Sequence, residues 1–137
     1  MNPLEYDALF LVGGHGTVVD FTVNKTLKAS IESCLAAGKI VAAVCHGPIA
    51  LAQCEKPSGE PLLQGMRVTG FSNSEEEAVK YTSQMPFLLE SKFKELGADY
   101  HKGDDWSSNV CVDGNLVTGQ NPQSSKECAS VVGELLS

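Results

Sequence analysis

The chain has 137 residues, enough for one domain with a single core, and its 42% apolar and 20% charged residues are ordinary for a globular protein. Its formal net charge of -7, with no cluster of lysine or arginine, argues against nucleic acid as a partner. No apolar run approaches the roughly 20 residues that cross a bilayer, so no membrane partner is expected. The stretch Met1–Glu5 has neither a basic region nor an apolar core and predicts no signal peptide.

The cysteine pattern bears on the redox compartment. The five cysteines are scattered and contain no C-x-x-C pair: Cys34, Cys45, Cys54, Cys111 and Cys128. Such a set is typical neither of a disulfide framework nor of a zinc site. The three histidines are scattered as well, so no metal is expected. We therefore predict a reducing, cytoplasmic location in which a thiol can act as a nucleophile.

The first third of the chain predicts a strand, a helix and a second strand. The apolar run Tyr6–Val12 is typical of a strand buried on both faces, and it ends in the glycine-rich turn Gly13–Gly16. A helical spacing of apolar residues follows over Thr22–Ala37, and Lys39–Val44 is again a strand. Strand–helix–strand units are right-handed with parallel strands, so the two strands are predicted to be parallel neighbours.

The second strand ends at Cys45-His46-Gly47, and a helix is predicted over Ile49–Gln53. A strand, a sharp turn with a nucleophilic side chain and a helix is the pattern of a nucleophile elbow. Such a turn would aim the Cys45 sulfur at the crevice beyond the carboxyl end of the strand, where open α/β sheets bind ligands. The alternative is that Cys45 is a small buried apolar residue, as most free cysteines are.

The middle of the chain contains short elements. Cys54–Gln64 reads as a loop and Met66–Thr69 as a short strand, followed by a turn and helix start over Gly70–Glu77. Pro86–Leu96 predicts a helix and Ala98–Lys102 another strand.

The C-terminal part predicts a hairpin and a helix. Residues 110–118 form the hairpin, with Asp113-Gly114 as its two-residue turn. A helix follows from about Ser124 to Leu136, where Ser124 and Glu127 offer a capping box.

A thiol enzyme also needs a base, a group that orients the base, and donors for an oxyanion. At the start of a helix the Cys45 thiol would have a lowered pKa, and His46 is the nearest base. The backbone amides of Gly14 and His46 would form the oxyanion hole, since adjacent parallel strands place their terminal loops side by side.

The acidic run after Asn73 is the obvious source of the orienting acid. Glu77 is one candidate, although it lies three residues after Ser74, and this spacing by itself favours a capping box. Glu75 and Glu76 read as solvated acids of a first helical turn.

Three further residues have an ordinary alternative beside the functional one. His15 reads as a loop residue before it reads as a ligand, and Trp106 either lines a pocket or is a half-buried loop residue. Asn121-Pro122 is either a plain helix start or a loop that reaches over the crevice.

Four motifs in order resemble the ThiJ/PfpI superfamily, within the class I glutamine amidotransferase-like fold. They span nearly the whole chain and are 7-DALFLVGGHG-16, 42-AAVCHGP-48, 68-VTGFS-72 and 116-LVTGQNP-122. The resemblance is strongest to the glutathione-independent glyoxalase (glyoxalase III) and chaperone-like branch. It implies a flavodoxin-like α/β fold, a three-layer sandwich with a mainly parallel sheet. It also implies a single domain over residues 1–137 that is shortened at its N-terminus, without the strand and helix, and the cysteine-binding glutamate, that precede this region in relatives.

Carried over by position, the implied catalytic triad is Cys45, His46 and Glu77, with Glu76 as the fallback acid. Gly14, His15 and Gly47 are the implied oxyanion and substrate-binding positions. The implied reaction adds the Cys45 thiolate to the aldehyde of methylglyoxal, giving a hemithioacetal and then D-lactate without metal, cofactor or glutathione. A homodimer is the implied assembly.

A second hypothesis is a non-catalytic stress protein, either a redox sensor or a holdase chaperone, with the same fold and a reactive Cys45. The missing N-terminal glutamate favours this alternative. A third, weaker hypothesis is protease or amidase chemistry on the same residues.

Overall fold

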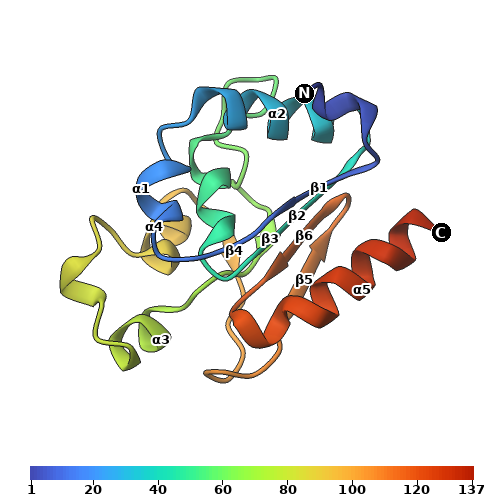
Figure 1. The fold of residues 1–137 in the computed structure, drawn as a ribbon. Helices are drawn as coiled ribbons and strands as arrows, with labels where there is room; N and C mark the ends of the chain where they lie inside the picture. The colour runs from blue at the N-terminus through green and yellow to red at the C-terminus, as the bar shows by residue number, and fades with distance from the viewer.

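The computed structural model describes residues 1–137, and its centre is a four-stranded sheet (Figure 1). The strand order is β1 (Ala8–Leu11), β2 (Ile40–Val44), β6 (Leu116–Gly119) and β5 (Val110–Asp113). The first three strands run parallel, and β5 is antiparallel to β6. The mainly parallel sheet and the parallel pairing of β1 with β2 are therefore confirmed.

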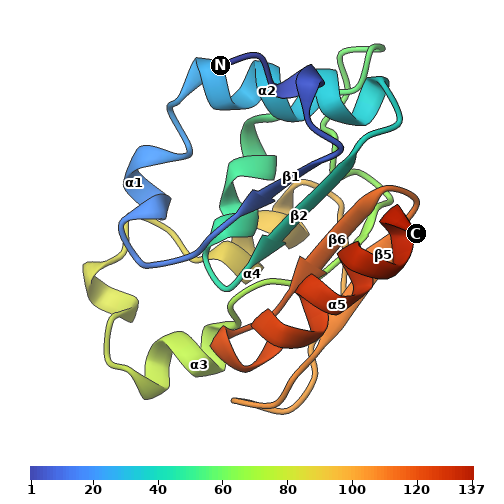
Figure 2. The same cartoon turned by 45° about the vertical axis from the view of Figure 1, so that its right-hand side comes forward.

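Helices cover both faces of this sheet, with α5 (Ser125–Leu136) on one side and α2 (Lys25–Ala36) on the other (Figure 2). β2 is buried along its whole length, and its side chains alternate between two apolar clusters. Ala42 packs in the cluster of α5, whereas Val41 packs in the larger cluster of α2 and the 3-10 helix η2 (Gly47–Gln53). This is the predicted three-layer sandwich, and the alternation follows from the two-residue period of a strand.

The remaining elements are short. The helical ones are η1 (Pro3–Glu5), α1 (Thr17–Asp20), α3 (Asn73–Ala78), η3 (Thr82–Gln84), α4 (Leu89–Glu95) and η4 (Pro122–Ser124). β3 (Arg67–Val68) and β4 (Asp99–Tyr100) pair with each other in a separate parallel sheet. None of the helices has the length and apolar character needed to span a membrane.

The hairpin forms, but its turn is one residue later than predicted. Asp113 pairs with Leu116, so the two turn residues are Gly114 and Asn115. Gly114 has a φ of 57°, which glycine adopts at no steric cost. Asp113 stays in the strand, where its carboxylate accepts a hydrogen bond from the backbone N–H of Arg67.

The cap of the last helix also differs from the prediction. Ser124 makes no capping bond to the start of α5. Its hydroxyl instead donates to the side chain of Asn121, which caps η4. Glu127 accepts a hydrogen bond from Ser108 rather than closing a capping box.

Candidate active site

Cys45 lies at a strained turn at the carboxyl end of β2. Its φ of 63° belongs to the left-handed region, which is uncommon for a residue with a side chain and is found where the surroundings enforce it. The backbone N–H of Cys45 donates to Gly119 at 3.0 Å, and its carbonyl accepts from Phe71 at 2.9 Å. These two bonds fix the turn between neighbouring segments, as the elbow pattern predicts.

Two glycines let the elbow pack against the loop after β1. A Cβ on Gly13 would lie 2.6 Å from the Val44 carbonyl oxygen, and one on Gly47 would lie 2.5 Å from the Leu11 carbonyl oxygen. Both distances are too short for any real side chain. The structure thus gives Gly47 a packing role, whereas the sequence suggested an oxyanion or substrate contact.

His46 connects the thiol to a carboxylate. Its Nδ1 lies 3.4 Å from the Cys45 sulfur, and its Nε2 lies 2.7 Å from Oε2 of Glu76. An ionised carboxylate can only accept, so the Nε2 atom carries the hydrogen and Nδ1 is left as an acceptor facing the thiol. Burial lowers the pKa of His46, although the Glu76 carboxylate opposes that shift. A neutral imidazole in this tautomer is suited to take the thiol proton.

The acid beside His46 is Glu76, the fallback choice, and not Glu77. Glu76 is buried, while Glu77 is exposed and makes no contact with the histidine. The reason is the start of α3: Ser72, rather than Ser74, is its N-cap, and the capping box is closed by Glu75. This start turns Glu75 and Glu76 inward, so the expectation that both are solvated is also wrong.

Glu75 organises the loops around the site. Its side chain is fully buried and accepts hydrogen bonds from the hydroxyl and backbone N–H of Ser72, the N–H of Trp106 and the side chain of Asn121. Burial by itself would raise the pKa of Glu75, but these donors together hold the pKa below its ordinary value. Sequence reasoning missed this role, and the only signal for it was the capping pattern with Ser72.

His15 comes from the turn after β1 and meets the same carboxylate. Its Nε2 lies 2.7 Å from Oε1 of Glu76, so the two oxygens of Glu76 serve two imidazoles. The His15 ring lies 4.2 Å from the His46 ring and stacks on Tyr81 at 4.6 Å. The substrate-binding position inferred for His15 therefore lies in the site, although the structure ties it to Glu76.

His15, His46 and Glu76 are also the residues that could hold a metal ion. Their ligand atoms lie within 4.8 Å of one another, and two imidazoles with one carboxylate suit zinc. In the arrangement described above, each Nε2–H is hydrogen bonded to the carboxylate. An ion would have to displace both of these hydrogens.

The Cys45 thiol is not acidified in the way its position predicts. Burial raises its pKa to about 11, and the nearby carboxylates of Glu75 and Glu76 raise it as well. The backbone N–H groups of His46 and Gly14 act in the opposite direction, because both are directed at the sulfur. The helix after the elbow is a 3-10 helix of seven residues rather than an α-helix. The same two N–H groups are the predicted oxyanion donors.

The thiol opens into a pocket of about 390 Å³. Gly14, His15 and His46 line it beside Cys45, and Trp106 also belongs to its lining. Trp106 is held there by the bond to Glu75 and by an edge-on contact with Phe71, with ring centroids 5.7 Å apart. Pro122 also lines the pocket, so the loop after β6 does reach the crevice.

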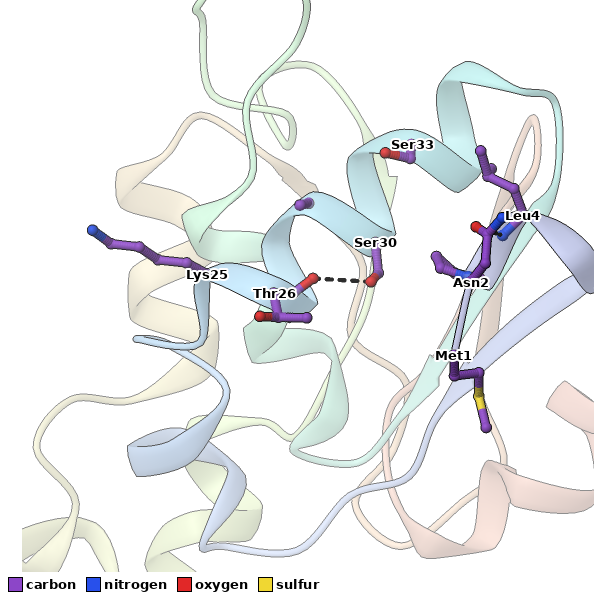
Figure 3. Close-up of a pocket in the computed structure, with 9 residues that line it drawn as sticks. Met1, Asn2, Leu4, Lys25, Thr26, Ser30 and Ser33 are labelled. Carbon is purple, nitrogen blue, oxygen red and sulfur yellow. Dashed lines mark hydrogen bonds between the residues drawn. The ribbon is translucent and has the colours of Figure 1, made fainter.

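A second hollow, of about 450 Å³, lies between the N-terminal residues and α2 (Figure 3). Its lining includes Met1, Asn2, Lys25 and Ser30, and the Ser30 hydroxyl is already bonded to the Thr26 carbonyl. No thiol, imidazole or carboxylate side chain lines it. This hollow therefore lacks the reactive groups that line the Cys45 pocket.

An α/β sheet with a cysteine elbow, an adjacent histidine and a buried carboxylate defines a class of α/β proteins that carry this elbow. Comparison of the sequence with models of known protein families identifies one family within this class. The DJ-1/PfpI family model matches residues 1–134, and the chain belongs to that family.

The curated relatives include glutathione-independent glyoxalases. Glyoxalase 3 of Candida albicans is 33% identical over 96% of this chain, and a glutathione-independent glyoxalase of Saccharomyces cerevisiae is 34% identical over 94%. The chain spans 58% and 57% of the lengths of these two proteins.

Crystal structures of similar proteins share the fold of this chain. The rapid encystment protein of Francisella tularensis is 37% identical and superposes over the whole chain with a TM-score of 0.97, covering 61% of that structure. The crystal structure of glyoxalase III from Candida albicans is 34% identical with a TM-score of 0.91, over 98% of this chain and 59% of the other.

Proposed function

We propose that the chain carries the active site of a glutathione-independent glyoxalase, which converts methylglyoxal and water into D-lactate through a hemithioacetal on Cys45. The observation that carries the proposal is the continuous contact from the Cys45 sulfur through both nitrogens of His46 to Glu76. The glyoxalases among the relatives support the choice of substrate.

The first step is addition of the thiol to the aldehyde carbon. The sulfur forms a bond to that carbon, and the thiol proton passes to Nδ1 of His46, which lies 3.4 Å away. Because the pKa of Cys45 is raised to about 11, the proton leaves as the bond forms rather than beforehand. The N–H groups of Gly14 and His46 stabilise the developing oxyanion, which then takes the proton back.

The remaining steps move hydrogen between the two substrate carbons. A proton leaves the carbon that carries sulfur, giving an enediol, and a proton is added to the neighbouring carbon. The first carbon is thereby oxidised to a thioester and the second is reduced to an alcohol. Water then cleaves the thioester to give lactate and the free thiol, so no external oxidant or reductant is needed. His46 is the proton carrier, and Glu76 stabilises it when it is charged.

The experiment is a glutathione-free assay of methylglyoxal loss coupled to enantiospecific detection of D-lactate. The protein should form D-lactate, and Cys45→Ala should reduce the rate to the background of buffer. Cys45→Ala protein that turns over methylglyoxal as fast as the parent would end the proposal. Thermal unfolding of both proteins establishes that the variant is folded.

A holdase chaperone is the second candidate, and one observation favours it. β1 has a neighbouring strand on one side only, and the flanking residues Tyr6 and Val12 are 50% and 70% exposed. An open edge with apolar side chains can bind unfolded chains. Suppression of client aggregation that survives Cys45→Ala, without D-lactate formation, would favour this candidate. A redox-sensor role fits less well, because oxidation requires a thiolate and burial of Cys45 opposes one.

Two further expectations belong to the same proposal: a cytoplasmic location and a homodimer. All five cysteines are unpaired, as a reducing compartment requires. The mass in solution, measured by light scattering after gel filtration, tests the dimer.

A further inference from the structure

We propose that His15 is a positioning residue for the Cys45–His46 pair: it holds the second oxygen of Glu76, and so fixes the carboxylate that orients His46. This inference rests on the proposed function for its effect on turnover. Its structural part can be tested independently of any substrate.

The two oxygens of the Glu76 carboxylate contact two different histidines. Glu76 binds His46 through Oε2 and His15 through Oε1, both at 2.7 Å, and its side chain is only 3% exposed. A carboxylate held at one oxygen can rotate about its last side-chain bond, where torsional wells are broad. A donor on each oxygen removes that freedom. The plane of the Glu76 carboxylate is thus set jointly by the two imidazoles.

Removal of the His15 side chain would leave Oε1 of Glu76 without its donor. A buried carboxylate oxygen without a partner is expensive, so Glu76 without His15 would turn toward another donor or admit water. Either change weakens the bond to Nε2 of His46. That bond selects the tautomer in which Nδ1 faces the Cys45 sulfur. A disturbance at His15 therefore reaches the thiol through two hydrogen bonds.

Three aromatic rings and one hydrogen bond hold the His15 side chain. The centroid of its ring lies 4.2 Å from that of His46 and 4.6 Å from that of Tyr81, and Phe71 contacts it edge-on with centroids 5.9 Å apart. Its side chain is 35% exposed, and its only hydrogen bond is the one to Glu76. The side chain is therefore packed for one contact, which is donation to Oε1 of Glu76.

Two substitutions at His15 separate the effect of hydrogen-bond donation to Glu76 from the effect of the imidazole ring. His15→Gln keeps an N–H near the position of Nε2, whereas His15→Phe keeps the ring packing and removes the donor. The first readout is the Nε2–H resonance of His46 in proton NMR. Its rate of exchange with water should rise about tenfold or more in His15→Phe and stay within about threefold of the parent in His15→Gln. The second readout is kcat for D-lactate formation, measured as a function of pH. Relative to the parent, kcat should fall about tenfold in His15→Phe and return toward the parent value in His15→Gln.

Three results would overturn the proposal. Equal losses of D-lactate formation in both variants would mean that the His15 imidazole itself exchanges protons with substrate. Unchanged exchange of the His46 resonance in His15→Phe would mean that His15 does not hold Glu76. An exchange rate raised equally in both variants would mean that donation does not restore the carboxylate. If the parent forms no D-lactate, the proposed function fails, while the NMR comparison still decides the role of His15.

Discussion

Three contacts between a histidine and a carboxylate occur in the molecule, and the surroundings of two of them, His46–Glu76 and His101–Asp99, differ sharply. In the His46–Glu76 pair the side chains are 1% and 3% exposed, and the nitrogen–oxygen distance is 2.7 Å. In the His101–Asp99 pair the side chains are 43% and 62% exposed, and the distance is 3.0 Å. Water competes freely for the second pair and is excluded from the first. The same two chemical groups therefore form an oriented proton acceptor in one place and an ordinary surface contact in the other.

The largest expected effect comes from removing the buried imidazole. His46→Ala leaves the Cys45 thiol in place but takes away the atom that receives its proton. Because burial keeps the thiol protonated at neutral pH, D-lactate formation should fall by about 10³-fold. Steady-state kinetics without glutathione measures this loss. A fall of less than about threefold would mean that another group accepts the proton.

The next effect concerns stability at the neighbouring carboxylate. Glu75→Gln places an amide where Ser72, Trp106 and Asn121 all donate, so at least one donor must lose its acceptor. We expect a loss of about 2–3 kcal/mol in the free energy of unfolding at pH 7, measured by urea titration. Glu77→Gln, an exposed residue of the same helix, is the control and should change the free energy by less than about 0.5 kcal/mol.

The effect of Glu75 also has a definite pH dependence. Its pKa in the folded protein lies below the ordinary value of 4.5. Its contribution to stability is therefore complete above that ordinary pKa and is lost as the pH falls through the folded pKa. The difference in stability between the parent and Glu75→Gln should shrink below about pH 4.5. A difference that grows on acidification would contradict the assigned shift.

The pH dependence of thiol reactivity tests the raised pKa of the Cys45 thiol. With its pKa raised to about 11, the thiolate fraction should rise about tenfold per pH unit between pH 7 and pH 10. Alkylation by iodoacetamide, located by peptide mass spectrometry, measures the rate at Cys45 alone. The other four cysteines are buried and serve as internal references. A plateau between pH 7 and pH 8 would instead show the acidic thiol that the elbow pattern suggests.

The smallest effect is expected at the exposed pair. His101→Ala removes the contact with Asp99 and should change the free energy of unfolding by less than about 0.5 kcal/mol. D-lactate formation should stay within about twofold of the parent, because the pair lies outside the lining of the Cys45 pocket. Since the substitution matches His46→Ala, a comparable loss at both positions would break the contrast between the two pairs.

The fold could be predicted from sequence because its determinants are local. The apolar run of β2 is too continuous for a solvated strand, and the residues around Cys45 are small enough for a sharp turn. The hairpin could also be predicted, although its turn lies one residue later: Asp113 stays in the strand and accepts a hydrogen bond from the backbone N–H of Arg67. Such a partner depends on tertiary contact and leaves no pattern nearby in the sequence.

The acid of the site could not be chosen from sequence, because the choice depends on where α3 begins. Ser72 and Ser74 are both plausible N-caps, and moving the start by two residues rotates the helix enough to exchange the buried and exposed acids. The contact between His15 and Glu76 could not be predicted from sequence for a similar reason. The two residues are 61 positions apart and meet only when the loops at the carboxyl ends of the strands are assembled.

One pair of variants tests the central claim, that Glu76 is the carboxylate that orients His46. In Glu76→Gln the amide can donate to Nε2, which would place the hydrogen of His46 on Nδ1 and turn that atom from an acceptor into a donor toward the thiol. The same substitution at Glu77 changes an exposed side chain one residue away. We expect glutathione-free D-lactate formation to fall by about 100-fold or more in Glu76→Gln and to stay within about twofold in Glu77→Gln. Equal rates in the two variants, or a larger loss in Glu77→Gln, would contradict the account.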